Sequence, residues 1–164
     1  MQRTISAMVG KGSVNHNSRK FRAENVDGTR THLNIDYCNE NIKTVYHELF
    51  DEALERYNAK QIRSDRKIKD YYEKIRSSKQ EKPFHEIILQ VGGKGNMNAD
   101  TENGELAKQI LDEYYQGFQE RNPQLRVFSA HLHMDEATPH LHIDFVPFTL
   151  SLIHISEPTR PEPI

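Results

Sequence analysis

The sequence has no tryptophan, one cysteine and no long apolar run. The single cysteine, Cys38, excludes an internal disulfide and favours a reducing, cytoplasmic compartment. Without about 18 consecutive apolar residues no transmembrane helix is expected, and residues 1–13 lack the apolar core of a signal peptide. The chain of 164 residues is 35% hydrophobic and 28% charged, which suits one domain with a real core.

Net charge is also low, at −2, but the charges are unevenly distributed. Between Arg56 and Lys82 there are ten Lys or Arg residues against four Asp or Glu. A local basic excess of this kind is compatible with nucleic-acid binding. A solvated helix surface accounts for the same charges equally well, so charge alone leaves both interpretations open.

Hydrophobic periodicity predicts an α+β fold. Apolar residues spaced for one helical face indicate helices over residues 41–60, 64–79 and 105–120. Strands are expected at 4–9 and 84–91, and a hairpin at 126–147; residues 13–36 are expected to form a loop with a short strand at 31–35. This order predicts an antiparallel or mixed sheet with helices packed on one face. On the first hairpin strand, alternation places Phe128, Ala130 and Leu132 on one face and His131 and His133 on the other.

Three histidines gather around the turn of this hairpin. His140 and His142 point the same way because strand side chains repeat every second residue, and His133 lies across the turn. Three imidazole ligands with vacant positions are typical of a catalytic metal site, and nitrogen ligands favour a transition metal over Mg²⁺. Glu136, in the turn, is close enough to act as a base or to support the ligands. The alternative is a solvated polar hairpin with incidental histidines.

A fourth histidine, His16, lies far away in the sequence with Arg19 and Arg22 after it. Taken alone, a loop histidine carries little information. Beside a metal site it becomes a candidate nucleophile or base, and the two arginines could hold phosphate oxygens.

These segments resemble the motifs of the MobV relaxases, also called Mob/Pre plasmid mobilisation or recombination proteins. His16-Asn17-Ser18-Arg19 is similar to the family's HNxR motif, and Asn34-Ile35-Asp36-Tyr37 is similar to a less specific second block. The run from His133 to His142 matches HxDExTPHxH at each motif position. It includes the histidine–hydrophobe–histidine signature of the wider HUH endonuclease group. The resemblance covers about residues 1–149.

The resemblance implies a metal-dependent enzyme that nicks DNA at a plasmid origin of transfer and transfers the strand. His133, His140 and His142 would bind the cation, with Mn²⁺ favoured and Mg²⁺ or another transition metal as alternatives. His16 would attack the phosphodiester and become covalently linked to DNA, assisted by Glu136 and Arg19. The DNA, single-stranded or folded as a hairpin, would be contacted by Arg19, Arg22, Lys67 and Lys69. No oligomeric state follows from the resemblance.

The chain departs from the family at its end. Residues 151–164 resemble a translated sequencing-adapter read-through and are expected to be a non-native tail. The catalytic domain is therefore expected to span residues 1–150 and to lack its C-terminal end, which can leave the chain unstable or inactive. Two other functions stay open: a non-catalytic DNA- or RNA-binding module that uses the same sheet, and a metallohydrolase of another substrate in which His16 is incidental.

Overall fold

The computed structural model describes residues 4–20, 23–93 and 97–149, so Arg22 and the expected tail at 151–164 lie outside the described residues. The chain divides into two compact units. Of the described residues, the first comprises 4–20, 23–40, 84–93 and 97–147, and the second comprises 41–83 and 148–149. Among the described helices, none combines the length and the apolar character needed to cross a membrane.

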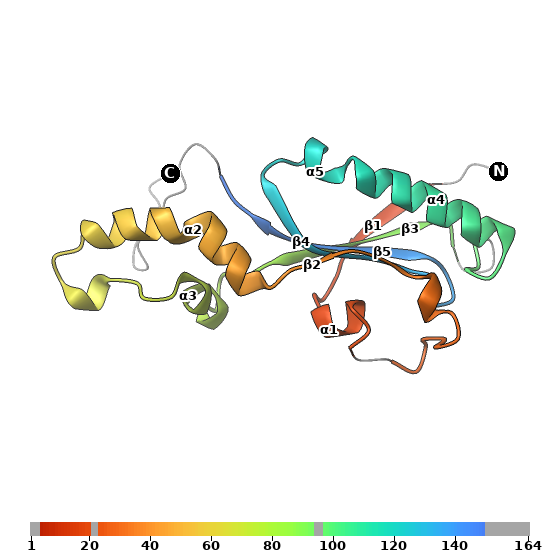
Figure 1. The fold of residues 1–164 in the computed structure, drawn as a ribbon, viewed down its shortest axis with the longest axis horizontal. Helices are drawn as coiled ribbons and strands as arrows, with labels where there is room; N and C mark the ends of the chain where they lie inside the picture. Colours follow the sequence, from red (N-terminus) through yellow and green to blue (C-terminus); the bar gives the residue numbers. More distant parts are fainter. Residues whose placement is uncertain (1–3, 21–22, 94–96, 150–164) are drawn as a thin grey trace. The chain divides into compact units, whose positions relative to one another are not determined.

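The first unit is built on a five-stranded, wholly antiparallel sheet with the strand order β1-β3-β5-β4-β2. Helix α4 lies along one face of the sheet and the short helix α1 lies on the opposite face (Figure 1). The strands are β1 (Ile5–Val9), β2 (Ile35–Asn39), β3 (His85–Val91), β4 (Leu125–His133) and β5 (His140–Pro147). The helices are α1 (Val14–Asn17), a 3-10 turn at Thr31–Leu33, α4 (Glu102–Gln116) and α5 (Phe118–Arg121). The predicted α+β fold is confirmed.

The hydrophobic core lies between α4 and the sheet. Alternate residues of the three central strands point toward the helix, so one face of the sheet is continuously apolar. From the strands the core takes Leu89, Val91, Val127, Ala130, Leu132, Leu141, Ile143 and Phe145, and from the segments covering them Met97, Ala107, Leu111 and Phe118. The opposite face is left free for polar side chains, and this is where the histidines lie.

Simple alternation fails at the start of β4. Val127 pairs with Phe145 and Ser129 pairs with Asp144, so Phe128 is an extra residue on this strand. Such a bulge reverses the facing of the residues before it. Val127 therefore joins the core, whereas Phe128 contacts Phe84 with ring centroids 5.2 Å apart. The prediction that Phe128 shares a face with Ala130 and Leu132 is wrong for this reason.

The region predicted as a loop, residues 13–36, contains more structure than expected. It holds α1 and the 3-10 turn, and the predicted strand at 31–35 begins only at Ile35. The helix predicted at 105–120 begins earlier, at Glu102, where the Thr101 side chain accepts a hydrogen bond from the amide of Gly104.

The second unit contains α2 (Ile42–Ala59), a 3-10 turn at Ser64–Arg66 and α3 (Tyr71–Ser77). The predicted first helix is confirmed, with the Asn41 side chain accepting from the amide of Lys43. The predicted second helix is wrong over its first half. Asp70, rather than Ser64 or Asp65, caps α3 by accepting from the amide of Glu73, because the main chain of Ile68 is held by the Asn58 side chain instead of a helix.

The contact between α4 and the sheet should dominate the stability of the first unit. Leu111 is fully buried there, whereas Leu106 on the same helix is 37% exposed. We expect Leu111→Ala to lower the free energy of unfolding by about 2–5 kcal/mol, since it leaves a cavity in a packed core. Leu106→Ala should cost less than about 1 kcal/mol. Urea unfolding followed by circular dichroism measures both, and equal losses would contradict this description of the core.

Candidate active site and metal centre

Helix α1 carries His16 over the polar face of the sheet. The chain leaves β1 through Gly10, whose amide donates to the carbonyl of Glu86 and where a Cβ atom would lie only 1.9 Å from Glu86 Oε1. A larger residue at this position would have to displace the buried side chain of Glu86. The His16 ring then lies edge-on to the His133 ring at 6.3 Å between centroids, and its Nε2 is 3.7 Å from Glu136 Oε1. The structure thus brings the distant candidate nucleophile to the histidine cluster.

Arg19 connects α1 to the turn between β4 and β5. It adopts a left-handed conformation, with φ 60°, which a non-glycine residue takes only at some cost. Its Nε and Nη2 donate to Asp135 at 2.9 and 2.5 Å, Nη2 also donates to Glu136 at 2.9 Å, and Nη1 donates to the carbonyl of His16 at 2.9 Å. The Arg19 side chain is only 7% exposed, so it holds together the nucleophile segment and the turn.

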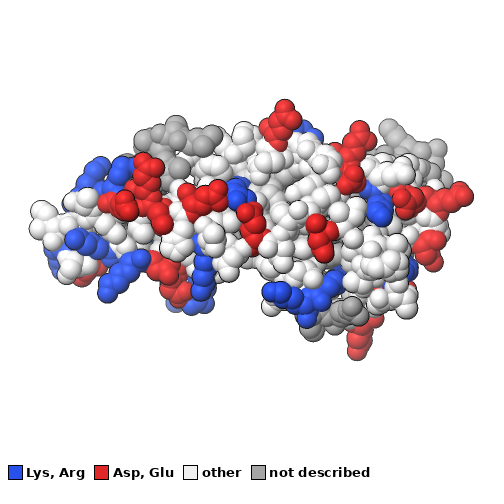
Figure 2. Space-filling model, viewed as in Figure 1, with Lys and Arg blue, Asp and Glu red and all other residues white. Residues whose placement is uncertain are grey.

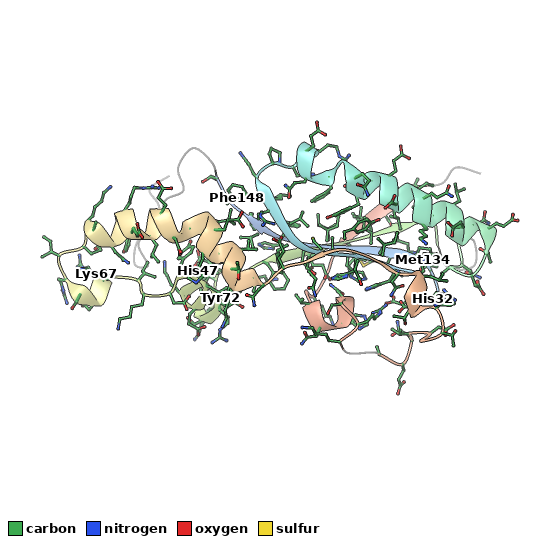
Figure 3. All side chains as sticks on the ribbon, in the orientation of Figure 1. His32, His47, Lys67, Tyr72, Met134 and Phe148 are labelled. Atoms are coloured by element: carbon green, nitrogen blue, oxygen red, sulfur yellow. The ribbon has the colours of Figure 1, made fainter. Side chains whose placement is uncertain are left out.

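Asp135 is the buried centre of this turn, which begins after Met134 (labelled in Figure 3). Besides Arg19, the side chains of Thr31 and Asn34 each donate to its carboxylate at 2.9 Å. Burial alone would raise the pKa of Asp135, but the hydrogen bonds from these three groups outweigh it and lower the pKa to about 2. The Asn34 side chain also accepts from the amide of Met134, which explains why the second motif block begins there.

Hydrogen bonds fix the tautomers of two cluster histidines. His133 Nε2 lies 2.7 Å from the carbonyl oxygen of Asn17, and His140 Nε2 lies 3.0 Å from Gln90 Oε1. Gln90 is oriented by its own amide nitrogen, which donates to the carbonyl of Gly92. Since both oxygens only accept, Nε2 of each ring carries the proton and Nδ1 carries a lone pair.

The unprotonated ring nitrogens of the cluster lie close to one another and to Glu136. Among the described residues, the Nδ1 atoms of His133 and His140 and both ring nitrogens of His142 are buried without a hydrogen-bond partner. Ligand atoms of His133, Glu136 and His142 lie within 4.8 Å of one another, and His140 Nδ1 is 3.6 Å from Glu136 Oε2. Burial, followed by the charge of His142, lowers the pKa of His133 to about 3, so its ring is neutral at pH 7. Buried imidazoles with unbonded ring nitrogens, beside a carboxylate, fit a divalent transition metal.

The sequence predicted His133, His140 and His142 as the metal ligands, and the structure brings two of these three together with Glu136. His133 and His142 converge closely, and Glu136, predicted as a base, joins them in the group that could hold a metal. His140 faces Glu136 from the side. His131, on the same face, uses both ring nitrogens, at 2.7 Å from Asp36 and 3.0 Å from Ser129. It therefore has no free lone pair to offer.

Two buried carboxyl groups, those of Glu86 and Asp144, lie next to the histidine cluster. The sequence analysis did not identify them. The Asn17 side chain donates to Glu86 and, at 3.4 Å, to Asp144, and Glu86 Oε1 is 3.7 Å from His142 Nδ1. Burial and the neighbouring Glu86 raise the pKa of Asp144 to about 9, so the pair shares a proton. The available signal was position: Glu86 and Asp144 are register partners on the histidine face.

Lys67 and Lys69, predicted to contact DNA, lie exposed in the second unit. They are not part of the histidine cluster.

The sequence model of the plasmid recombination enzyme family, Mob_Pre, matches residues 12–151. The chain belongs to this family. The chain is 29% identical over 140 residues to plasmid recombination enzyme type 3 of Staphylococcus aureus, and to the same degree to that of Mammaliicoccus lentus. Each match covers 83% of this chain but only 29% of the relative, so the chain spans less than a third of their length.

Solved structures show the same fold. The MobM relaxase domain (MOBV; Mob_Pre), Mn-bound and in complex with plasmid pMV158 oriT DNA, superposes with a TM-score of 0.54 at 22% identity. The match covers 88% of this chain and 71% of that one. A second crystal structure of the same complex gives a TM-score of 0.53. The five-stranded sheet with its helices is therefore the relaxase fold.

Removal of Arg19 should damage both folding and the site. Arg19→Ala leaves the buried carboxylate of Asp135 without its main partner, so we expect a loss of about 3–5 kcal/mol in the free energy of unfolding. Arg63, which pairs with Asp65 on the surface, is the matched control; Arg63→Ala should cost less than about 1 kcal/mol. Thermal or urea unfolding of both variants tests this, and a small loss for Arg19→Ala would show that the pair does not hold the turn.

Proposed function

We propose that this chain carries the catalytic part of a relaxase that nicks plasmid DNA at an origin of transfer and keeps the cut strand covalently attached. The observation that carries the proposal is the position of His16, held by Arg19 beside Glu136 and next to a cluster of buried imidazole nitrogens without hydrogen-bond partners. Membership of the Mob_Pre family and the fold shared with the DNA-bound MobM relaxase domain support it.

In the proposed reaction a ring nitrogen of His16 attacks the phosphorus of the scissile phosphodiester. A P–N bond forms and the P–O3′ bond breaks, which leaves a free 3′-hydroxyl and a phosphoramidate at the 5′ end. The ring proton passes to Glu136, and the departing oxygen takes a proton from water. Burial raises the pKa of Glu136. The hydrogen bond from Arg19 and the nearby His140 and His133 lower this pKa by more than burial raises it, so Glu136 is ionised and can accept a proton. A neutral imidazole is a competent nucleophile at pH 7.

We propose that His133 and His142, with Glu136 or His140 as the third ligand, hold a divalent cation, with Mn²⁺ favoured. A cation bound there supplies Lewis-acid stabilisation for the charge that develops on the phosphoryl oxygens. The protein's own part is to present neutral nitrogens: the Asn17 carbonyl and Gln90 hold the protons of His133 and His140 away from the cluster.

The DNA contacts proposed from the sequence fall into two groups. The guanidinium of Arg19 donates hydrogen bonds to Asp135, Glu136 and the carbonyl of His16. This geometry favours a role in positioning the nucleophile over a role in binding phosphate. Lys67 and Lys69 are exposed and suit contacts to the DNA backbone. Arg22 follows the same motif and is proposed to hold phosphate near the nick.

The test uses a labelled single-stranded DNA library with a random central segment, from which the protein selects its own site. The protein is incubated with Mn²⁺ and analysed on a denaturing gel. We expect a labelled band at the mass of a protein–DNA adduct, and sequencing of the captured strands then identifies the site. Cleaved DNA with free ends and no adduct would instead support a metallohydrolase. Binding without cleavage would support a non-catalytic DNA-binding module.

A further inference from the structure

The loop between α2 and α3, residues 60–69, is the most basic stretch of the described chain. It carries five cations, Lys60, Arg63, Arg66, Lys67 and Lys69, and a single acidic residue, Asp65. All of them are exposed, and within the loop Arg63 pairs with Asp65 at 2.7 Å. In the described part of the chain, no carboxylate lies within ion-pair distance of the other four cations. Figure 2 shows Lys and Arg side chains at this end of the unit, with some Asp and Glu side chains among them.

Both ends of the loop are held by hydrogen bonds or packing despite its exposure. The Asn58 side chain donates to the carbonyl of Ile68 and accepts from its amide, both at 2.8 Å. Ile68 itself is buried against Ala53, with Tyr57 and Tyr71 packed beside it. At the other end, the amides of Lys60 and Gln61 donate to carbonyls of the last turn of α2. Its two ends are therefore fixed before any partner binds, which lowers the entropic cost of binding.

Ile62 lies in this loop and is 100% exposed. No other large apolar residue of the described chain is as exposed; Val9 follows at 80%. Exposure of an aliphatic side chain to water does not stabilise the folded protein. The neighbouring cations disfavour an apolar protein surface as its partner. An apolar side chain among cations is the arrangement with which some proteins wedge DNA base steps apart from the minor groove.

We propose that the α2–α3 loop binds duplex DNA, with its cations on the phosphates and Ile62 inserted as a wedge between base steps. The duplex is the paired part of the same DNA that carries the nick, so the inference rests on the proposed function for its biological setting. Lys67, labelled in Figure 3, marks the loop on the ribbon. Four unpaired cations supply affinity that is independent of sequence, and Ile62 adds a preference for deformable steps.

The charge part is tested by fluorescence anisotropy with the full chain and a short mixed-sequence duplex over a range of salt concentrations. The double variant Arg66→Ala/Lys67→Ala should reduce the slope of log affinity against log salt by about 0.9 for each phosphate that the protein no longer neutralises. Lys79→Ala, which removes an exposed cation of the same unit outside the loop, should leave the slope unchanged. Equal slopes for the wild type and the double variant overturn the proposal.

The wedge is tested with duplexes that contain 2-aminopurine at successive positions, since its fluorescence rises when a neighbouring base unstacks. We expect the wild type to raise the fluorescence and Ile62→Ala to abolish the rise, with affinity lowered roughly tenfold and the salt slope retained. Val9→Ala, on the exposed edge strand β1, is the control for loss of an exposed aliphatic group. If Ile62→Ala behaves like the wild type, Ile62 is not a wedge.

The two proposals can fail separately. If the wild type forms no covalent adduct with single-stranded DNA but binds duplex through this loop, the relaxase proposal fails and the loop inference stands. If the adduct forms and the loop variants bind duplex as the wild type does, the loop inference alone fails. Tight binding of the loop by a protein partner, with no duplex affinity, also overturns it.

Discussion

His16→Ala is expected to abolish the covalent protein–DNA adduct. The substitution removes the imidazole of helix α1, which among the described residues lies 3.7 Å from Glu136 Oε1 and edge-on to the ring of His133. Covalent capture should fall by on the order of 10³ or more, because a covalent path without its nucleophile has no partial substitute. Denaturing gel analysis of the labelled library with Mn²⁺ measures the loss.

The matched control is His47→Ala. His47 is exposed on α2, pairs with Asp51 and lies outside the histidine cluster, so its loss should leave adduct formation intact. Binding of Mn²⁺ by the His16→Ala protein shows that the site has folded. An adduct that persists in His16→Ala would place the nucleophile elsewhere and contradict the assignment.

Loss of His142 is expected to weaken Mn²⁺ binding by roughly a hundredfold or more. Loss of a residue that only supports a ligand already costs about 10- to 100-fold in metal affinity, and His142 is proposed as a ligand itself. His133→Ala should have an effect of the same size. Isothermal titration calorimetry, or the electron paramagnetic resonance signal of free Mn²⁺, measures this without any catalytic turnover.

The third ligand is decided by two further variants. If Glu136 completes the site with His133 and His142, Glu136→Gln should weaken Mn²⁺ binding more than His140→Ala does. If the three histidines expected from the sequence bind the ion, the order is reversed. His47→Ala again serves as the control, and unchanged affinity in both His133→Ala and His142→Ala would show that this cluster is not the metal site.

Local patterns predicted the regular elements well. The apolar stripe of α2 and the alternation of β4 and β5 depend on neighbours in the sequence, and these three elements formed where expected. Prediction failed where a distant or single side chain decided the backbone. Asn58 holds Ile68 out of the expected helix, and an extra residue, Phe128, shifts the facing of β4. Neither effect leaves a periodic signal.

The sequence by itself determined which residue types carry the chemistry. His16, Glu136 and the three hairpin histidines could be named from spacing and from the family motifs. Only the tertiary structure decided their states: the carbonyl of Asn17 sets the tautomer of His133, and Arg19 ties His16 to Asp135 and Glu136. These contacts join α1 to the β4–β5 turn over more than a hundred residues of chain, and a protonation state depends on the atoms that surround a ring in space.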